Sequence, residues 1–479
     1  MDNINKIKGL ALLPLIMLIT GSIDSIRNLP STALFGESLV FFLVMAAIIF
    51  LVPTALISAQ LASAMPKQGG IYFWVKKAFG PKTACLAIYL QWINTMVWFP
   101  TMLSFITATA AYLINPALAQ NPYYLVGTIL TVFWTITFIN MKGIQTSAQI
   151  ASVCAILGLL LPMILIIGLA GFWILSGQPL QIELSTKQFL PDFHYGHNWT
   201  SLTAIMAAFL GIELATVHIA DIKNAQKSFP KALLISVFII FFTMLMGALA
   251  IAVVLPQHEI RLVEGVMQAF SNFLNSYHLG SLIPVVTVML LIGSLGGLIN
   301  WLISPAKGLL QAAEDGFLPP SLTATNSQGA PYKILIVQGI LVSAICAIYL
   351  FLPSINTSYW LLTDLSTQLY MLMYIMMFIS AMKLTPSLNF NQLHFTVPGK
   401  KLGLYFFSLL GIIGCITSIL VGFLAPQNLA VHPGLSYASM FALGLVGFIL
   451  PVLGFYWYYQ RKQPPQEPKD DLDVALENV

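Results

Sequence analysis

The chain has 479 residues, of which 58% are hydrophobic and 8% are charged, and its formal net charge is +4. A soluble domain would carry about 25% charged residues, so this composition excludes an ordinary soluble protein. The small net charge gives no indication of a nucleic-acid partner.

Long apolar segments follow one another along nearly the whole chain. Each approaches or exceeds the roughly 20 helical residues that cross about 30 Å of hydrocarbon. The runs lack the alternation of membrane β-strands. The sequence therefore predicts an all-α protein of the lipid bilayer with twelve transmembrane helices. The predicted segments are 10–35, 38–63, 83–112, 122–140, 148–176, 198–220, 230–255, 281–306, 331–352, 357–382, 403–425 and 434–459.

The basic residues sort between the connections of these segments. Of the 21 Lys and Arg residues, 18 lie in one alternate set of connections or within three residues of it, and only Lys187 and Arg261 lie in the other set. The remaining one, Arg27, falls inside the first segment. Because cytoplasmic loops collect Lys and Arg, this pattern predicts that both termini face the cytoplasm.

The first segment contains residues that suit a membrane helix poorly. The run TGSIDSIRNLP at 20–30 includes Gly21, Ser22, Asp24, Arg27 and Pro30. Proline lacks a backbone donor and glycine permits unwound backbone. Unpaired backbone groups are tolerated at this depth only inside the protein or along a cavity. We therefore expect an unwound stretch near Gly21 that faces a chamber.

The sixth segment has a similar interruption, with Gly211, Ile212 and Glu213 in mid-membrane. The two interrupted helices open successive blocks of five segments, which predicts two inverted repeats at 1–176 and 198–382. Two extra helices would occupy 403–459, completing a transporter domain over 1–460. The polar, acidic tail 461–479 is expected to be disordered. Half-helix ends and free carbonyls at such breaks can bind a carboxylate and an ammonium, as an amino acid requires.

Three motifs occur in an order that resembles the amino acid–polyamine–organocation (APC) superfamily. They are residues 65–81 (MPKQGGIYFWVKKAFGP), 211–213 (GIE) and 304–319 (SPAKGLLQAAEDGFLP). The resemblance implies a 12-helix fold of two five-helix inverted repeats plus two helices. It also implies transport of an amino acid or amine by alternating access.

Within that superfamily the chain looks most like the bacterial glutamate/γ-aminobutyrate antiporters. Residues 39–42, 189–193, 265–268 and 397–399 are similar to their connecting segments. The resemblance implies proton-dependent exchange of an amino acid for its decarboxylation product in the bacterial cytoplasmic membrane, as in acid resistance. Two positions depart from the pattern, because Gly297 replaces an acid in segment 8 and Arg27 lies in a break that is usually aromatic. A permease or exchanger for cationic amino acids or polyamines is the alternative.

An ionisable group at the bilayer centre costs roughly 2.5–3.5 kcal/mol and therefore needs a partner, a proton or water. Asp24 and Arg27 either pair with each other at positions i and i+3 or contact the substrate or a proton. Glu213 is the candidate proton acceptor or ligand of the substrate amine. A buried carboxylate is easily protonated, which suits proton coupling.

Segment 10 supplies three further candidates. Asp364 is either a proton-coupling group or a residue near the outer end of the helix, where water solvates it. Tyr370 is a substrate-site candidate by the resemblance. Tyr374 lies on the same face and either packs or gates the cavity.

Other classes of protein lack support in the sequence. It has no GxxxxGK[ST] loop, no HExxH motif and no partnered nucleophile, so neither an ATP-driven pump nor an intramembrane enzyme is indicated. A sensor would need an output domain, and no connection is long enough for one. We expect no cofactor or metal, and the oligomeric state is not indicated.

Overall fold

The computed structural model describes residues 12–65, 70–142, 153–154, 156–182, 199, 202–214, 216, 225–425 and 436–460. In these ranges the chain forms helices and turns and has no β-strand. The motif at 189–193 and the tail 461–479 lie outside the described residues. The α-helices are α1 (Leu12–Ile23), α2 (Leu29–Ala33), α3 (Leu39–Ala46), α4 (Val52–Ala64), α5 (Ile71–Phe79), α6 (Pro81–Ala111), α7 (Pro122–Met141), α9 (Leu161–Leu175), α10 (Leu202–Ala207), α11 (Ala225–Val254), α12 (Gly265–Ser276), α13 (Ile283–Glu314), α14 (Tyr332–Cys346), α15 (Ile348–Phe351), α16 (Ile355–Leu384), α17 (Lys400–Val421) and α18 (Tyr437–Gln460).

Nine stretches of the described chain are long and apolar enough to cross a membrane, and each coincides with a predicted segment. The other three predicted segments are the two interrupted helices and α6, which has 31 residues but carries many polar side chains. Large apolar side chains are exposed on α17 and α18, for example Leu420 and Leu443 at 65% each. Such surfaces suit contact with lipid. The described chain is therefore consistent with twelve crossings.

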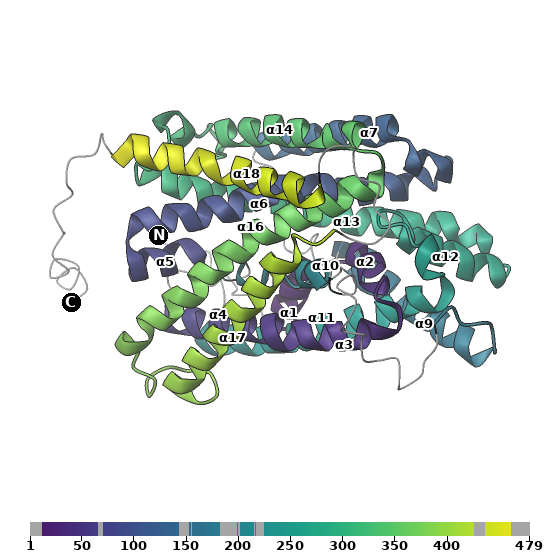
Figure 1. Ribbon diagram of the computed structural model, residues 1–479, viewed down its shortest axis with the longest axis horizontal. Coiled ribbons are helices and arrows are strands. Elements are labelled where there is room, and N and C mark those ends of the chain that lie inside the picture. Colours follow the sequence, from purple (N-terminus) through teal and green to yellow (C-terminus); the bar gives the residue numbers. More distant parts are fainter. Residues whose placement is uncertain are drawn as a thin grey trace, which may run out of the picture.

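Many of the long helices run along the long axis of the molecule, α16 and α17 cross them obliquely, and the short α2 and α10 lie near the centre (Figure 1). The α2 and α10 helices contact each other, and α6 packs against both α13 and α16. The two interrupted segments therefore meet inside a frame of long, continuous helices.

The first interruption begins three residues later than expected. Gly21 lies in the last turn of α1, and the helix ends at Ile23. Asp24 and Ser25 are not helical, and a 3₁₀ turn at Ile26–Asn28 leads into α2. The break therefore lies inside the predicted run 20–30, while Gly21 itself stays helical. Pro30 lies in the first turn of α2, where its missing donor costs little, so a new helix starts there.

The second interruption lies where the sequence predicts it. The α10 helix ends at Ala207, and residues 208–211 form a turn before a 3₁₀ stretch at 212–214. Gly211 has φ +100°, a conformation that other residues rarely adopt. The glycine therefore allows the chain to change direction in the middle of the bundle.

Two of the motifs that suggested the family meet at one end of the bundle. Lys76 on α5 lies 2.6 Å from the carboxylate of Asp315, which follows α13, and Tyr72 also donates a hydrogen bond to that carboxylate. Burial and the neighbouring Asp315 raise the pKa of Tyr72, so its hydroxyl stays a donor. These contacts tie the connection after the second segment to the end of the eighth.

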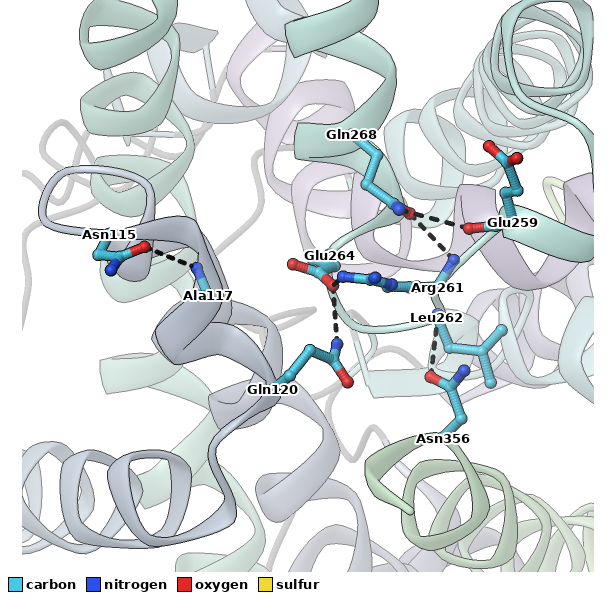
Figure 2. Close-up of polar contacts among 9 residues, drawn as sticks. All are labelled: Asn115, Ala117, Gln120, Glu259, Arg261, Leu262, Glu264, Gln268 and Asn356. Carbon is cyan, nitrogen blue, oxygen red and sulfur yellow. Dashed lines mark hydrogen bonds and ion pairs between the residues drawn. The ribbon is translucent and has the colours of Figure 1, made fainter. Parts of the chain in front are cut away.

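A second polar cluster ties the opposite end of the bundle, near α12 (Figure 2). The buried carboxylate of Glu264 accepts hydrogen bonds from Arg261 at 2.6 Å and from Gln120 at 2.7 Å. The backbone amide of Leu262 donates to Asn356 on α16 at 3.3 Å. The connection before α12 is thus attached to α16 and to the 3₁₀ turn Pro116–Gln120 that follows α6.

Candidate functional site

Glu213 is enclosed by neutral donors from two long helices. Its side chain is 1% exposed. Gln91 on α6 donates to Oε1 at 3.0 Å, Tyr370 on α16 also donates to Oε1, and Tyr374 donates to Oε2. Neutral donors stabilise a carboxylate without cancelling its charge. If Glu213 takes a proton, it becomes a donor itself, and at least one of these hydrogen bonds has to rearrange.

The interruption at Gly211 is connected directly to this cluster. Its backbone amide donates to the hydroxyl of Tyr374 at 2.9 Å, and the same hydroxyl donates to Glu213. Ile212 between them is fully buried. A change in the protonation of Glu213 therefore reaches the backbone of the break through a single tyrosine.

Replacing Gly211 by alanine should destabilise the protein by about 1–3 kcal/mol, because its backbone conformation is strained for residues with a Cβ. The added Cβ would also lie 3.2 Å from the ring of Trp301. We expect a lower thermal midpoint in detergent. Gly127→Ala on α7 is the control, since nothing lies within 4 Å of its added Cβ. Equal midpoints for the two variants would contradict this interpretation.

Arg27 lies in the first interruption, and the side chains of the described residues that contact its guanidinium are neutral. Its Nη1 donates to Thr101 on α6 at 2.8 Å and to the hydroxyl of Tyr359 on α16 at 3.3 Å. The guanidinium lies 5.4 Å from the ring centroid of Trp98. Its Nε is buried and has no hydrogen-bond partner, and the residue is only 5% exposed. The guanidinium therefore keeps an uncompensated positive charge.

Asp24 points to a different helix. Its Oδ2 accepts a hydrogen bond from Thr243 on α11 at 2.8 Å, while Oδ1 is buried without a partner. Asp24 and Arg27 are both described, yet they form no ion pair. The interpretation that they pair with each other is therefore wrong for this structure. Two opposite charges remain three residues apart in one interruption.

Two tryptophans bridge the interruptions. The rings of Trp98 on α6 and Trp301 on α13 have centroids 5.1 Å apart. Trp98 lies beside Arg27. Trp301 is the side chain nearest to the position that a Cβ on Gly211 would occupy. Aromatic walls of this kind, with a few convergent polar groups, are typical of small-molecule sites.

The structure brings five of the ten predicted site residues together, around the second interruption. Gly211, Glu213, Tyr370 and Tyr374 form one cluster. Gly21 and Ser22 lie in helix α1, and the side chain of Ser22 is not among those that the structure describes.

Asp364 is bonded by Tyr437 of α18, away from both interruptions. It is 2% exposed, so the expectation of a solvated residue near the helix end is wrong.

Sequence reasoning missed the site residues supplied by the continuous helices. These residues are Gln91, Trp98, Thr101, Thr243, Trp301 and Tyr359. One signal could have found those on α6, because this helix carries an unusual number of polar residues for a membrane segment. Polar side chains inside a bilayer usually face the interior of the bundle.

Comparison with known proteins agrees with this architecture. A family model for amino acid permeases matches residues 10–448. An uncharacterized transporter of Legionella pneumophila is 39% identical over 459 residues, covering 96% of this chain and 98% of the relative. A glutamate/γ-aminobutyrate antiporter of Lactococcus lactis is 28% identical, covering 98% of this chain and 95% of the relative.

More distant proteins share parts of this likeness. A probable agmatine/putrescine antiporter of Lactococcus lactis is 22% identical over 353 residues, 74% of each chain. The crystal structure of a manganese transporter of Eremococcus coleocola superposes with a TM-score of 0.58, covering 94% of this chain and 93% of that one. At 13% identity, this likeness concerns the fold alone. The family match spans nearly the whole chain, and this protein belongs to the amino acid permeases of the APC superfamily, which are membrane transporters and not enzymes.

Proposed function

We propose that this permease is a secondary active antiporter that exchanges an acidic amino acid, such as glutamate, for its decarboxylation product, such as γ-aminobutyrate. The observation that supports this best is the pair of opposite charges in the first interruption. Asp24 and Arg27 are buried, do not neutralise each other, and each keep one polar atom without a partner. A substrate that carries both an ammonium and a carboxylate compensates both charges at once.

The two proposed substrates share the groups that this site would bind. In both glutamate and γ-aminobutyrate, a short carbon chain separates an ammonium group from a distal carboxylate. We assign the shared carboxylate to Arg27 and the ammonium to Asp24. The rest of the substrate would contact the backbone of the two interruptions, at Asp24 in the first and around Gly211 and Ile212 in the second. Gly21 and Ser22, the other candidate substrate-binding residues of the first segment, lie in the last turn of α1 just before this backbone.

The alternative is a permease or exchanger for cationic amino acids or polyamines. The resemblance to a probable agmatine/putrescine antiporter and the partly unpartnered Asp24 favour it. A substrate with two positive groups would, however, come close to the guanidinium of Arg27. Like charges in a low-dielectric site repel strongly, so this alternative ranks second.

Proton coupling is assigned to Glu213. In the absence of a proton its carboxylate accepts hydrogen bonds from Tyr370 and Tyr374, and the hydroxyl of Tyr374 accepts one from the amide of Gly211. Protonation would release at least one of the tyrosine hydroxyls and loosen the second interruption. The two interruptions would then move relative to α6 and α16 as the site opens to alternate sides of the membrane.

The orientation follows from the basic connections. We infer that both termini face the cytoplasm, in the cytoplasmic membrane of a bacterium. The contact of Lys76 with Asp315 would then lie at the cytoplasmic end, and the cluster around Glu264 at the outer end. We keep the division into repeats at 1–176 and 198–382, with extra helices at 403–459, as part of the proposal.

Exchange can be tested in vesicles that contain the purified protein. Vesicles loaded with γ-aminobutyrate should take up labelled glutamate faster than empty vesicles at acidic external pH, because outward movement of one substrate returns the carrier. Protein-free vesicles are the control. Equal uptake by loaded and empty vesicles would contradict exchange of this pair. Block of uptake by putrescine, and not by γ-aminobutyrate, would favour the cationic alternative.

A further inference from the structure

Another polar cluster, distinct from those around Glu213 and Glu264, lies between α16 and the two helices α17 and α18. Tyr437 of α18 donates to Oδ2 of Asp364 on α16. Gln368 lies one turn later on the same face of α16. It contacts α17 closely, since a Cβ on Gly422 would lie 2.8 Å from its Nε2. Ser418 lies one turn before Gly422 on α17.

The polar atoms of this cluster are buried and lack partners. The exposed fraction is 2% for Asp364 and 0% for both Gln368 and Ser418. Oδ1 of Asp364, both amide atoms of Gln368 and Oγ of Ser418 have no hydrogen bond. An unmade bond of this kind costs about 1–3 kcal/mol. Several such atoms in one region indicate a site that takes a ligand.

The charges around the cluster identify the ligand. Among the described residues, no Lys, Arg or His forms an ion pair with Asp364. The titratable group that faces it is Tyr437 on α18, while α17 presents Ser418 and, one turn earlier, Cys415. On the α6 side, Ser366 of α16 donates to Asn94, which is neutral. A buried carboxylate without a cationic partner is stabilised when it binds a proton.

We propose that Asp364, Gln368, Ser418 and Tyr437 form a second proton-binding site, separate from Glu213 and shared between the repeat and the extra helices. The proton resides on Oδ1 of Asp364, which then donates toward the amide oxygen of Gln368, one turn along the helix. The Gln368 amide nitrogen is left to donate toward Ser418. One proton thus gives partners to Oδ1 of Asp364 and to the amide oxygen of Gln368, and the amide nitrogen pairs with Ser418.

This site makes the packing of the extra helices depend on pH. Loss of the proton leaves a carboxylate in an apolar interface and weakens the packing of α16 against α17 and α18. The position of α18 therefore depends on the protonation of Asp364 through Tyr437. The inference needs only the membrane fold and does not depend on which amino acid is carried.

Infrared difference spectra of the full-length protein between acidic and alkaline pH test the site directly. A band of a protonated carboxyl should appear in the wild type, disappear in Asp364→Asn and persist in Glu213→Gln. Gln368→Met keeps the size of the side chain but removes its hydrogen-bonding groups, so the carboxyl band of Asp364 should shift in frequency. This variant also provides a readout if Asp364→Asn does not fold.

Several outcomes would overturn the proposal. A spectrum of Asp364→Asn identical to that of the wild type would show that Asp364 does not take up a proton. An unshifted band in Gln368→Met would remove the assigned acceptor. Disappearance of the band on addition of sodium at fixed pH, but not of choline, would show that the site takes a metal cation. These spectra require no transport, so failure of glutamate exchange leaves the readout intact.

Discussion

Replacing Arg27 by glutamine should raise the KM for glutamate by about 10- to 100-fold. The guanidinium is buried and lacks an acidic partner, so we expect it to form a charge-assisted bond with a substrate carboxylate. Such a bond contributes about 1.5–3 kcal/mol, and each 1.4 kcal/mol corresponds to a tenfold change in affinity. The KM for γ-aminobutyrate should rise similarly, because it has the same distal carboxylate.

Two kinds of control distinguish a role of Arg27 in substrate recognition from a purely structural role: free glutamine as a test substrate, and substitutions of the residues that contact Arg27. Free glutamine lacks the distal carboxylate, so its apparent affinity, measured by competition with labelled glutamate, should change little in Arg27→Gln. Arg27→Lys keeps the charge and should have a smaller effect. Thr101→Val and Tyr359→Phe remove neutral partners of Arg27 and should leave the preference for glutamate over glutamine intact. An equal loss for glutamate and glutamine in Arg27→Gln would assign Arg27 a structural role only.

Replacing Glu213 by glutamine should abolish most of the pH dependence of exchange before it abolishes substrate binding. The amide resembles the protonated carboxyl in shape and keeps a donor, but it cannot titrate. A single titrating proton changes an equilibrium by at most about tenfold per pH unit. In the wild type, exchange should fall as pH rises and the proton leaves. Exchange by the variant should stay nearly level over the same range, measured in vesicles with equal pH on both sides.

Two other variants sharpen this test. Tyr374→Phe keeps the carboxyl but breaks its connection to the amide of Gly211, so the pH dependence of exchange should weaken although Glu213 can still titrate. Glu259→Gln alters an exposed carboxylate far from the interruptions in sequence and should behave as the wild type. A wild-type pH profile in Glu213→Gln would exclude this residue as the coupling group.

Much of the architecture could be predicted because it depends on local properties of the chain. Hydropathy over about 20 residues decides whether a segment can cross a bilayer, and nine predicted segments coincide with suitable stretches. A glycine followed by an acid predicted the interruption at Gly211, where a positive φ excludes most other residues. The first interruption was located to within three residues, because glycine, serine, charged residues and proline in one short run suit a membrane helix poorly.

The sequence by itself determined that this is a helical membrane protein, which segments cross the bilayer and where two of them break, since these features follow from side chains close together in the chain. Only the tertiary structure decided the partners of the buried charges. Arg27 contacts Tyr359, which is 332 residues away, and Asp24 contacts Thr243, not Arg27. Asp364 was placed against Tyr437 for the same reason. A buried charge is compensated by whichever helix packs beside it, and hydropathy and local spacing contain no information about that choice.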